Sequence, residues 1–120
     1  MPHLTLEYTA NLASFDPTRA LAAINAAMFD SGQFSEPDIK SRAIAVGNFQ
    51  VGILQNPRAF VHLRIALLSG RSSAERKELA DAALAALGEL ILAPRGMEIQ
   101  LSVETSELDR DSYAKTIVHG

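Results

Sequence analysis

Hydrophobic and polar residues alternate in four stretches of the chain, with the period of two that is typical of half-buried strands. The stretches are His3–Tyr8, Ile39–Val51, Ala59–Leu68 and Met97–Thr105. The third is the clearest, because alternate positions within it are Val, Leu, Ile and Leu. The pattern predicts four strands, with a loop over Gly52–Pro57 between the second and the third.

Another stretch repeats apolar residues at the spacing of an amphipathic helix. It begins with Asp16, a good N-cap, and Pro17, which suits the first helical position. Gly32 supplies a stop signal. The sequence therefore predicts a helix over Pro17–Asp30.

A second helix is predicted from a capping box, in which Ser72 is followed three residues later by Glu75. Its apolar stripe consists of Leu79, Ala83, Leu87 and Ile91. Pro94 and Gly96 are expected to end it. Both predicted helices are rich in alanine, which allows a helix to approach a sheet closely.

The predicted order is strand, helix, strand, followed by strand, helix, strand. We expect one α/β (α+β) domain over residues 1–120, built from two repeated halves of about 1–56 and 57–120. The order fits a ferredoxin-like fold, and it fits equally well two β-α-β units side by side on one four-stranded sheet. Right-handed crossovers place both helices on one face. The strand edges that remain exposed favour an oligomer.

The composition is that of an ordinary globular protein, with 48% hydrophobic and 21% charged residues among 120. Cysteine is absent, which excludes disulfides, a thiolate nucleophile and cysteine metal sites. We see no signal peptide and no apolar stretch of the roughly 18 residues that a spanning helix needs. These features favour a cytoplasmic protein that does not enter a membrane.

The net charge of −3 argues against a general nucleic-acid surface. It is compatible with a small anionic substrate, because a few local cations are enough to bind one. His3, His62 and His119 lack metal-ligand spacing, so we expect no metal site, and we interpret His62 as a strand-face residue with a hydrogen-bond partner. Glu7 and Glu104 occupy similar places in the first and last strands. They are candidates for an acid–base pair, or else they are solvated strand positions.

Three cations are candidates for anion binding. Lys40 and Arg42 are two residues apart and share one face at the start of the second strand. Arg71 lies between the third strand and the second helix, where its charge adds to the N–H groups of the helix N-terminus. The alternative for Arg71 is a solvated loop arginine.

Pro2 follows the start methionine directly and precedes the first strand. Methionine before a small residue is normally removed in cells, and Pro2 would then carry a terminal secondary amine. Burial and neighbouring cations lower the pKa of such an amine from about 8, which makes it a general base at neutral pH. Phe49 or Phe60 is a candidate for the apolar wall around it, or else a core residue. Many proteins begin with Met-Pro, so the dipeptide alone is a weak signal.

Four segments of the chain together resemble one known family. They read MPHLTLEY, IKSRAIAV, AFVHLRIALLSGRSSAERKELADAAL and MEIQLSVE, with a weaker similarity at the end in YAKTIVH. The family is that of the 5-carboxymethyl-2-hydroxymuconate isomerases, in the tautomerase superfamily. The resemblance implies a tandem β-α-β fold, a homotrimer with sites near subunit boundaries, and a reaction without a cofactor. That reaction converts a 2-hydroxymuconate dienol into its 2-oxo-enoate isomer during homoprotocatechuate breakdown.

The resemblance also implies roles for individual residues. The family's amino-terminal proline corresponds to Pro2, as the base that carries the proton. A family arginine corresponds to Arg71, which is expected to bind a carboxylate of a di- or tricarboxylate substrate. Another family arginine corresponds to Lys40, and lysine lacks the bidentate fork for carboxylates, so Arg42 is a candidate to replace it.

Two alternatives stay open at the level of the sequence. One is a non-catalytic oligomeric domain of ferredoxin-like fold that binds a ligand, which predicts a purely antiparallel sheet. The other is a tautomerase with a different native substrate, which the lysine at position 40 suggests.

Overall fold

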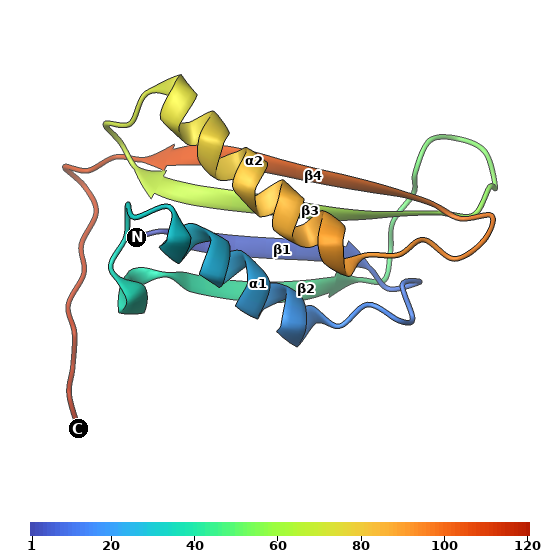
Figure 1. The fold of residues 1–120 in the computed structure, drawn as a ribbon, viewed down its shortest axis with the longest axis horizontal. Coiled ribbons are helices and arrows are strands. Elements are labelled where there is room, and N and C mark those ends of the chain that lie inside the picture. The colour runs from blue at the N-terminus through green and yellow to red at the C-terminus, as the bar shows by residue number, and fades with distance from the viewer.

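The structure, a computed structural model, describes residues 1–120. Its elements are, in order, β1 (His3–Thr9), α1 (Pro17–Asp30), a 3-10 turn η1 (Glu36–Asp38), β2 (Lys40–Val46), β3 (Arg58–Leu68), α2 (Ser73–Leu90) and β4 (Glu98–Leu108). The two helices run side by side in opposite directions over one face of a four-stranded sheet (Figure 1). This arrangement confirms the predicted tandem β-α-β fold with both helices on one face.

The strand order decides between the two topologies that the sequence left open. The sheet runs β2-β1-β3-β4, with β1 parallel to β2, β3 parallel to β4, and β1 antiparallel to β3. Each half is therefore a β-α-β unit with neighbouring parallel strands, and the two units meet at the antiparallel pair. The purely antiparallel sheet expected for the ferredoxin-like alternative is wrong.

The sheet has two ends, which differ in what they carry. We call the Pro2 end the one where β1 and β2 begin and β3 and β4 finish, and the Pro57 end the opposite one. At the Pro2 end, the Lys40 N–H donates to the Pro2 carbonyl oxygen at 3.2 Å. At the Pro57 end, the Glu98 N–H donates to the Pro57 carbonyl oxygen at 3.1 Å. In each half, a proline directly before the first strand thus pairs with the first residue of the second strand.

The core lies between the helices and the sheet face that they cover. Fully buried side chains from β1 and β3 alternate with mostly half-buried ones, as the period of two requires. The helices contribute one buried residue per turn. The core cluster consists of Leu4, Leu6, Ala20, Ile24, Met28, Ile39, Val61, Leu63, Ile65, Leu67, Leu79, Ala83 and Leu87.

The predicted first helix is confirmed over Pro17–Asp30, where Asp16 accepts a hydrogen bond from the Arg19 N–H as the N-cap. The predicted second strand is wrong at its far end, because β2 finishes at Val46. Apolar residues continue to Val51, but Gly47 and Asn48 interrupt the strand and a loop follows.

The second helix is shorter than predicted, and the last strand is shifted. Helix α2 ends at Leu90, and Ile91 already has an extended backbone, so Pro94 and Gly96 lie in the following turn and not at the helix end. Strand β4 begins at Glu98 and continues to Leu108. It continues past Thr105 because β3 offers it a pairing partner along its whole length.

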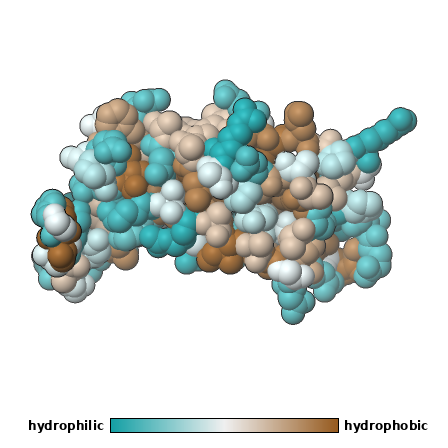
Figure 2. All heavy atoms as spheres, turned by 90° about the horizontal axis from the view of Figure 1, so that it is seen from below, coloured by the Kyte–Doolittle hydropathy of each residue, from teal (hydrophilic) through white to brown (hydrophobic).

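The second face of the sheet carries no helix (Figure 1). Its residues include partly exposed polar and charged side chains, among them His62, Arg64 and Glu104. Seen from below, hydrophobic and hydrophilic atoms are interspersed over the surface (Figure 2). No helix of the structure is both long enough and apolar enough to cross a membrane.

Candidate active site

Pro2 lies at the start of β1 with its side chain fully buried. Its carbonyl oxygen is held by the Lys40 N–H, so the first residue pair of β1 and β2 fixes its backbone. The ring is therefore enclosed at the point where the chain enters the sheet. A terminal group at this position has a rigid, apolar environment on one side.

The terminal amine in the structure belongs to Met1, and its surroundings lower its pKa below the ordinary value near 8. Burial is the largest cause, because it disfavours the charged form of the amine. The positive charge of Lys40 is the next largest cause, and Lys115 contributes in the same direction. Asp38 has the opposite effect. The chemical environment at this end of β1 thus favours a neutral amine.

Lys40 is the first residue of β2 and lies next to the chain terminus. Its ammonium donates to the backbone carbonyl oxygen of Asp38 at 2.5 Å. The carboxylate of Asp38 pairs instead with Lys115, at 2.8 Å between Oδ1 and Nζ. Asp38 therefore holds two ammonium groups, one on its backbone and one on its side chain.

Arg42 lies two residues further along β2 and donates to Nδ1 of His3 at 3.0 Å. Nε2 of His3 lies 3.2 Å from the hydroxyl oxygen of Tyr113. Because Nδ1 accepts from a guanidinium, the ring is neutral and carries its proton on Nε2, which donates to Tyr113. Burial and the charges of Arg42 and Lys40 lower the pKa of His3, which agrees with a neutral ring.

Arg71 lies between β3 and α2, also at the Pro2 end of the sheet. Its Nε donates to Oε1 of Gln33 at 2.8 Å, and its guanidinium lies 4.9 Å from the ring centre of Phe34. These contacts hold it half-buried, so it is not a freely solvated loop arginine. Next to it, Ser72 and Glu75 form the predicted capping box of α2. No hydrogen bond or ion pair joins Arg71 to Pro2, Lys40 or Arg42 in one chain.

The open face of the sheet carries a separate polar cluster around His62. Its Nδ1 lies 2.7 Å from the Ser102 hydroxyl, and its Nε2 lies 2.5 Å from the Glu104 carboxylate. The prediction that His62 has a hydrogen-bond partner is confirmed. The hydrogen bond from His62, followed by the one from Arg64, lowers the pKa of Glu104. A carboxyl with a lowered pKa is a poor general acid. The interpretation of Glu104 as a strand-face position is therefore favoured over an acid–base pair with Glu7.

The two phenylalanines considered for the apolar wall lie elsewhere. Phe49 and Phe60 pack edge-to-face, with 6.4 Å between ring centres. Phe60 lies near the start of β3, and its N–H donates to the Thr9 hydroxyl. Thr9 is the last residue of β1, so this contact lies at the opposite end of β1 from Pro2. Neither ring therefore lines the Pro2 end.

Sequence reasoning missed several residues that the structure brings to the Pro2 end. Asp38 contacts Lys40, Tyr113 contacts His3, and Lys115 pairs with Asp38. Gln33 and Phe34 hold Arg71. The C-terminal contacts could not come from periodicity, because that segment has no regular structure. The similarity of its sequence to the family was the one signal that pointed to it.

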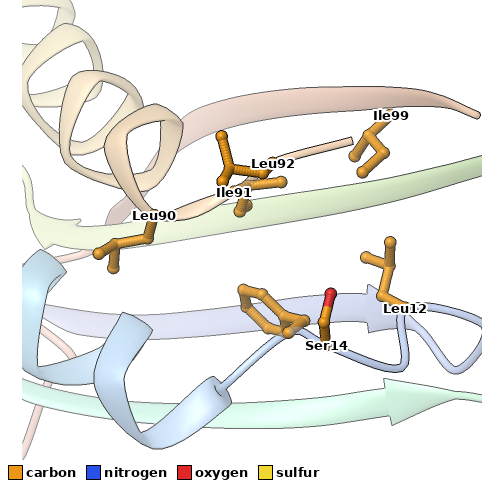
Figure 3. Close-up of a pocket in the computed structure, with 7 residues that line it drawn as sticks. Leu12, Ser14, Leu90, Ile91, Leu92 and Ile99 are labelled. Atoms are coloured by element: carbon orange, nitrogen blue, oxygen red, sulfur yellow. The ribbon is translucent and has the colours of Figure 1, made fainter. Parts of the chain in front are cut away.

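The most enclosed cavity of the molecule lies at the Pro57 end, with a volume of about 200 Å³. Leu90, Ile91 and Leu92 at the end of α2 face Leu12 and Ser14 across it (Figure 3). The Ser14 hydroxyl is its sole polar side chain, and no titratable group lines it. This cavity offers no chemistry, whereas the Pro2 end offers an amine environment and several cations.

Comparison with known proteins places the chain in a family. The sequence pattern of the 5-carboxymethyl-2-hydroxymuconate isomerase family matches residues 2–120. The structure is similar to that of a 5-carboxymethyl-2-hydroxymuconate isomerase from Deinococcus radiodurans R1, with 33% identity and a TM-score of 0.87. The similarity covers 96% of this chain and 88% of that one. Among curated proteins no sequence matches.

More distant structures share the fold. A crystal structure of a 5-carboxymethyl-2-hydroxymuconate delta-isomerase has a TM-score of 0.75 at 20% identity, covering 98% of this chain and 89% of that one. A fused 4-OT described as a symmetric trimer has a TM-score of 0.70 at 14% identity, covering 94% of this chain and 90% of that one. The family pattern over residues 2–120 and the 33% identity to the Deinococcus isomerase show that the chain belongs to the 5-carboxymethyl-2-hydroxymuconate isomerase family and is an isomerase.

Proposed function

We propose that this isomerase converts 5-carboxymethyl-2-hydroxymuconate, or a similar carboxylated 2-hydroxydienoate, into its 2-oxo-enoate isomer. The base is the secondary amine of Pro2, which becomes the chain terminus when Met1 is removed. Lys40, Arg42 and Arg71 are the cations that bind the anionic substrate. The proposal requires no cofactor, because one group that takes up and returns a proton completes the reaction.

The observation that carries the proposal is the environment of the terminal amine. Burial and the charge of Lys40 lower the pKa of the Met1 amine, and Pro2 itself is fully buried at the same place. An amine of Pro2 would experience the same apolar contact and the same cation. It would then be neutral near pH 7 and able to accept a proton.

The reaction balances with this single base. The Pro2 nitrogen takes the proton of the 2-hydroxyl, and the C2–O bond becomes a carbonyl as the diene electrons shift along the carbon chain. The same nitrogen then returns the proton to a carbon of the former diene. No electrons leave the substrate, so neither an oxidant nor a reductant is needed.

The cations stabilise the negative charge that develops in this step. Negative charge accumulates on the 2-oxygen while the hydroxyl proton is leaving, and a fixed cation stabilises it. Among these three cations, Lys40 is the one whose charge lowers the pKa of the terminal amine. Arg71 is half-buried and held by Gln33, so it is oriented in advance to bind a carboxylate.

A homotrimer is the assembly that we propose. The uncovered sheet face and the two lateral strands, β2 and β4, leave surface that a partner would cover. The fold is shared with a fused 4-OT described as a symmetric trimer. Light scattering on the purified protein should then give about three times the chain mass of 12.9 kDa. A monomer at micromolar concentration would contradict the trimer.

The substrate is less closely defined than the reaction. Lys40 stands where the family resemblance places an arginine, and an ammonium lacks the paired donors that fit a carboxylate. A panel of dienols with one, two and three carboxylates, compared by kcat/KM, identifies the native class. We expect the highest value for a di- or tricarboxylate.

The test of the base combines mass spectrometry with kinetics. The intact mass should correspond to residues 2–120, and ketonisation of a 2-hydroxymuconate should be followed by the change in absorbance. Pro2→Ala should lower kcat/KM on the order of 10²- to 10⁴-fold, the usual contribution of a general base.

Pro57→Ala is the matched control, because Pro57 occupies the equivalent place in the second half and its nitrogen is part of a peptide bond. It should retain kcat/KM within about threefold. An undiminished rate for Pro2→Ala, or an active enzyme that retains Met1, would remove Pro2 from the role of base.

A further inference from the structure

After β4 the chain turns and runs across the Pro2 end of the sheet, past the N-terminus and the start of β2 (Figure 1). It makes two specific contacts there. The Tyr113 hydroxyl lies 3.2 Å from Nε2 of His3, and Lys115 pairs with Asp38 at 2.8 Å. The C-terminal segment is thereby attached to β1 at the residue after Pro2, and to the turn η1 two residues before the start of β2.

The Lys115 ammonium keeps hydrogen-bonding capacity after this pairing. An ammonium has three N–H donors, and Asp38 accepts one of them in the contact at 2.8 Å. Both partners are about one-third exposed, so the pair is open to solvent and to a ligand. The hydrogen bond to Asp38 raises the pKa of Lys115, which keeps its charge at every pH of interest.

Cations outnumber anions around this contact. Lys40, Arg42 and Lys115 all act on the pKa of His3, and Asp38 is the acidic side chain that pairs with one of them. Lys40 bonds only the Asp38 backbone carbonyl, which leaves its own charge uncompensated. In a chain with a net charge of −3, such an excess at one place is suited to an anion with more than one negative group.

We propose that Lys115 is a substrate-binding residue that determines specificity: held over the Pro2 end by Asp38, it binds a carboxylate beyond those that Lys40, Arg42 and Arg71 bind. The inference rests on the proposed function. It makes the C-terminal segment a part of the site, with Tyr113 as the positioning residue that anchors the segment to His3. It also makes Lys115 the residue that distinguishes a tricarboxylate from a dicarboxylate substrate.

The experiment compares two substrates that differ by one carboxymethyl group, 5-carboxymethyl-2-hydroxymuconate and 2-hydroxymuconate. For each enzyme the measured quantity is the ratio of kcat/KM for the tricarboxylate to that for the dicarboxylate. Lys115→Gln should lower this ratio about tenfold or more, the usual effect of losing one charge-assisted hydrogen bond. Any change in the amine pKa acts on both substrates and cancels in the ratio.

Three further variants make the result specific. Lys115→Arg keeps the charge and should retain the ratio within about threefold. Lys77→Gln removes an ammonium that pairs with Asp81 at the same 2.8 Å, but on the exposed side of α2, and should leave the ratio unchanged. Tyr113→Phe should lower the ratio in the same direction as Lys115→Gln, because it releases the segment from His3.

The outcomes separate this inference from the proposed function. An unchanged ratio in Lys115→Gln overturns the role of Lys115 while wild-type activity on both dienols leaves the proposed function intact. Equal losses on both substrates overturn it too, since they show a tether and not a carboxylate contact. A wild-type protein lacking Met1 that isomerises neither dienol would instead refute the proposed function, and with it the basis of this inference.

Discussion

The two ends of the sheet begin in the same way and differ in everything that surrounds them. At each end a proline precedes a strand and accepts a hydrogen bond from the first residue of the neighbouring parallel strand. At the Pro2 end that residue is Lys40, and Arg71 and Lys115 lie at the same end. At the Pro57 end it is Glu98, next to Arg58 at 3.5 Å.

The difference shows what the fold provides and what individual residues add. The fold supplies two equivalent places for a proline, but the Pro57 end continues into an apolar cavity with one hydroxyl. The Pro2 end gathers cations because β2 begins there, α2 starts there and the C-terminal segment returns there. Chemistry is therefore expected at one end alone, and mutations at the two ends should have opposite signatures.

The largest expected effect is on stability, at the Pro57 end. Leu87 lies in the last turns of α2 and is fully buried in the core. Leu87→Ala should lower the free energy of unfolding by about 2–5 kcal/mol, the cost of a cavity in a packed core. Urea unfolding measures the loss, and kcat/KM per folded molecule should stay within about twofold of wild type. A large fall in kcat/KM at unchanged stability would contradict the expectation that chemistry is confined to the Pro2 end.

The next effect is on activity, at the Pro2 end. Arg71→Ala should lower kcat/KM for a carboxylated dienol on the order of 10²-fold, since it removes an oriented guanidinium from a developing anion. Arg95, exposed in the turn after α2 at the Pro57 end, is the matched control. Steady-state kinetics of Arg95→Ala should be those of wild type. Equal losses in the two variants would indicate a general effect of net charge.

A smaller effect concerns the caps of the helices, which lie at opposite ends. Ser72 caps α2 at the Pro2 end, next to Arg71, and Asp16 caps α1 at the Pro57 end. Ser72→Ala and Asp16→Ala should each lower the free energy of unfolding by about 1 kcal/mol. Ser72→Ala alone should also raise KM, because it loosens the turn that carries Arg71. A rise in KM for Ser72→Ala but not for Asp16→Ala would support the difference between the two ends of the sheet.

The smallest effect is on the acid side of the stability profile. Hydrogen bonding to Lys115 and its charge lower the pKa of Asp38 below the ordinary value. A carboxyl with a lowered folded-state pKa contributes stability above its unfolded pKa, and that contribution is lost as pH falls through the folded value. Asp38→Asn should therefore flatten the fall in unfolding free energy below about pH 4. Urea titrations from pH 2 to 7 test this, and parallel curves for the two proteins would contradict it.

The fold was accessible from the sequence because its signals are local. Asp16 with Pro17, and Ser72 with Glu75, fix where the helices begin, and strict alternation identifies β3. Order alone did not distinguish the two sheet topologies, since the pairing of β1 with β2 depends on contacts between distant segments. The end of β2 was overestimated because apolar residues continue into the loop, where no strand pairs with them.

The candidate site was accessible only in part. Pro2, Lys40 and Arg71 are flanked by strand and helix starts that the sequence reveals, so their common end could be deduced once the topology was known. The pairing of Asp38 with Lys115 spans 77 positions and joins a turn to an irregular segment. No periodicity encodes such a contact, because it depends on the path of the chain after β4. The neutral state of His3 likewise depends on Arg42, which reaches it from the neighbouring strand.

The matched hydrogen bonds of Pro2 and Pro57 have a consequence for the engineering of this chain. A circular permutant that opens the chain between Asn56 and Pro57 would give Pro57 a free secondary amine and bury Pro2 in a peptide bond. Its new terminus would face Glu98 where the native one faces Lys40. A neighbouring carboxylate stabilises an ammonium, so we expect the permutant's amine to be charged where the proposed mechanism requires a neutral Pro2 amine. Comparing the activities of the permutant and the parent would then separate the effect of position in the fold from the effect of the neighbouring charge.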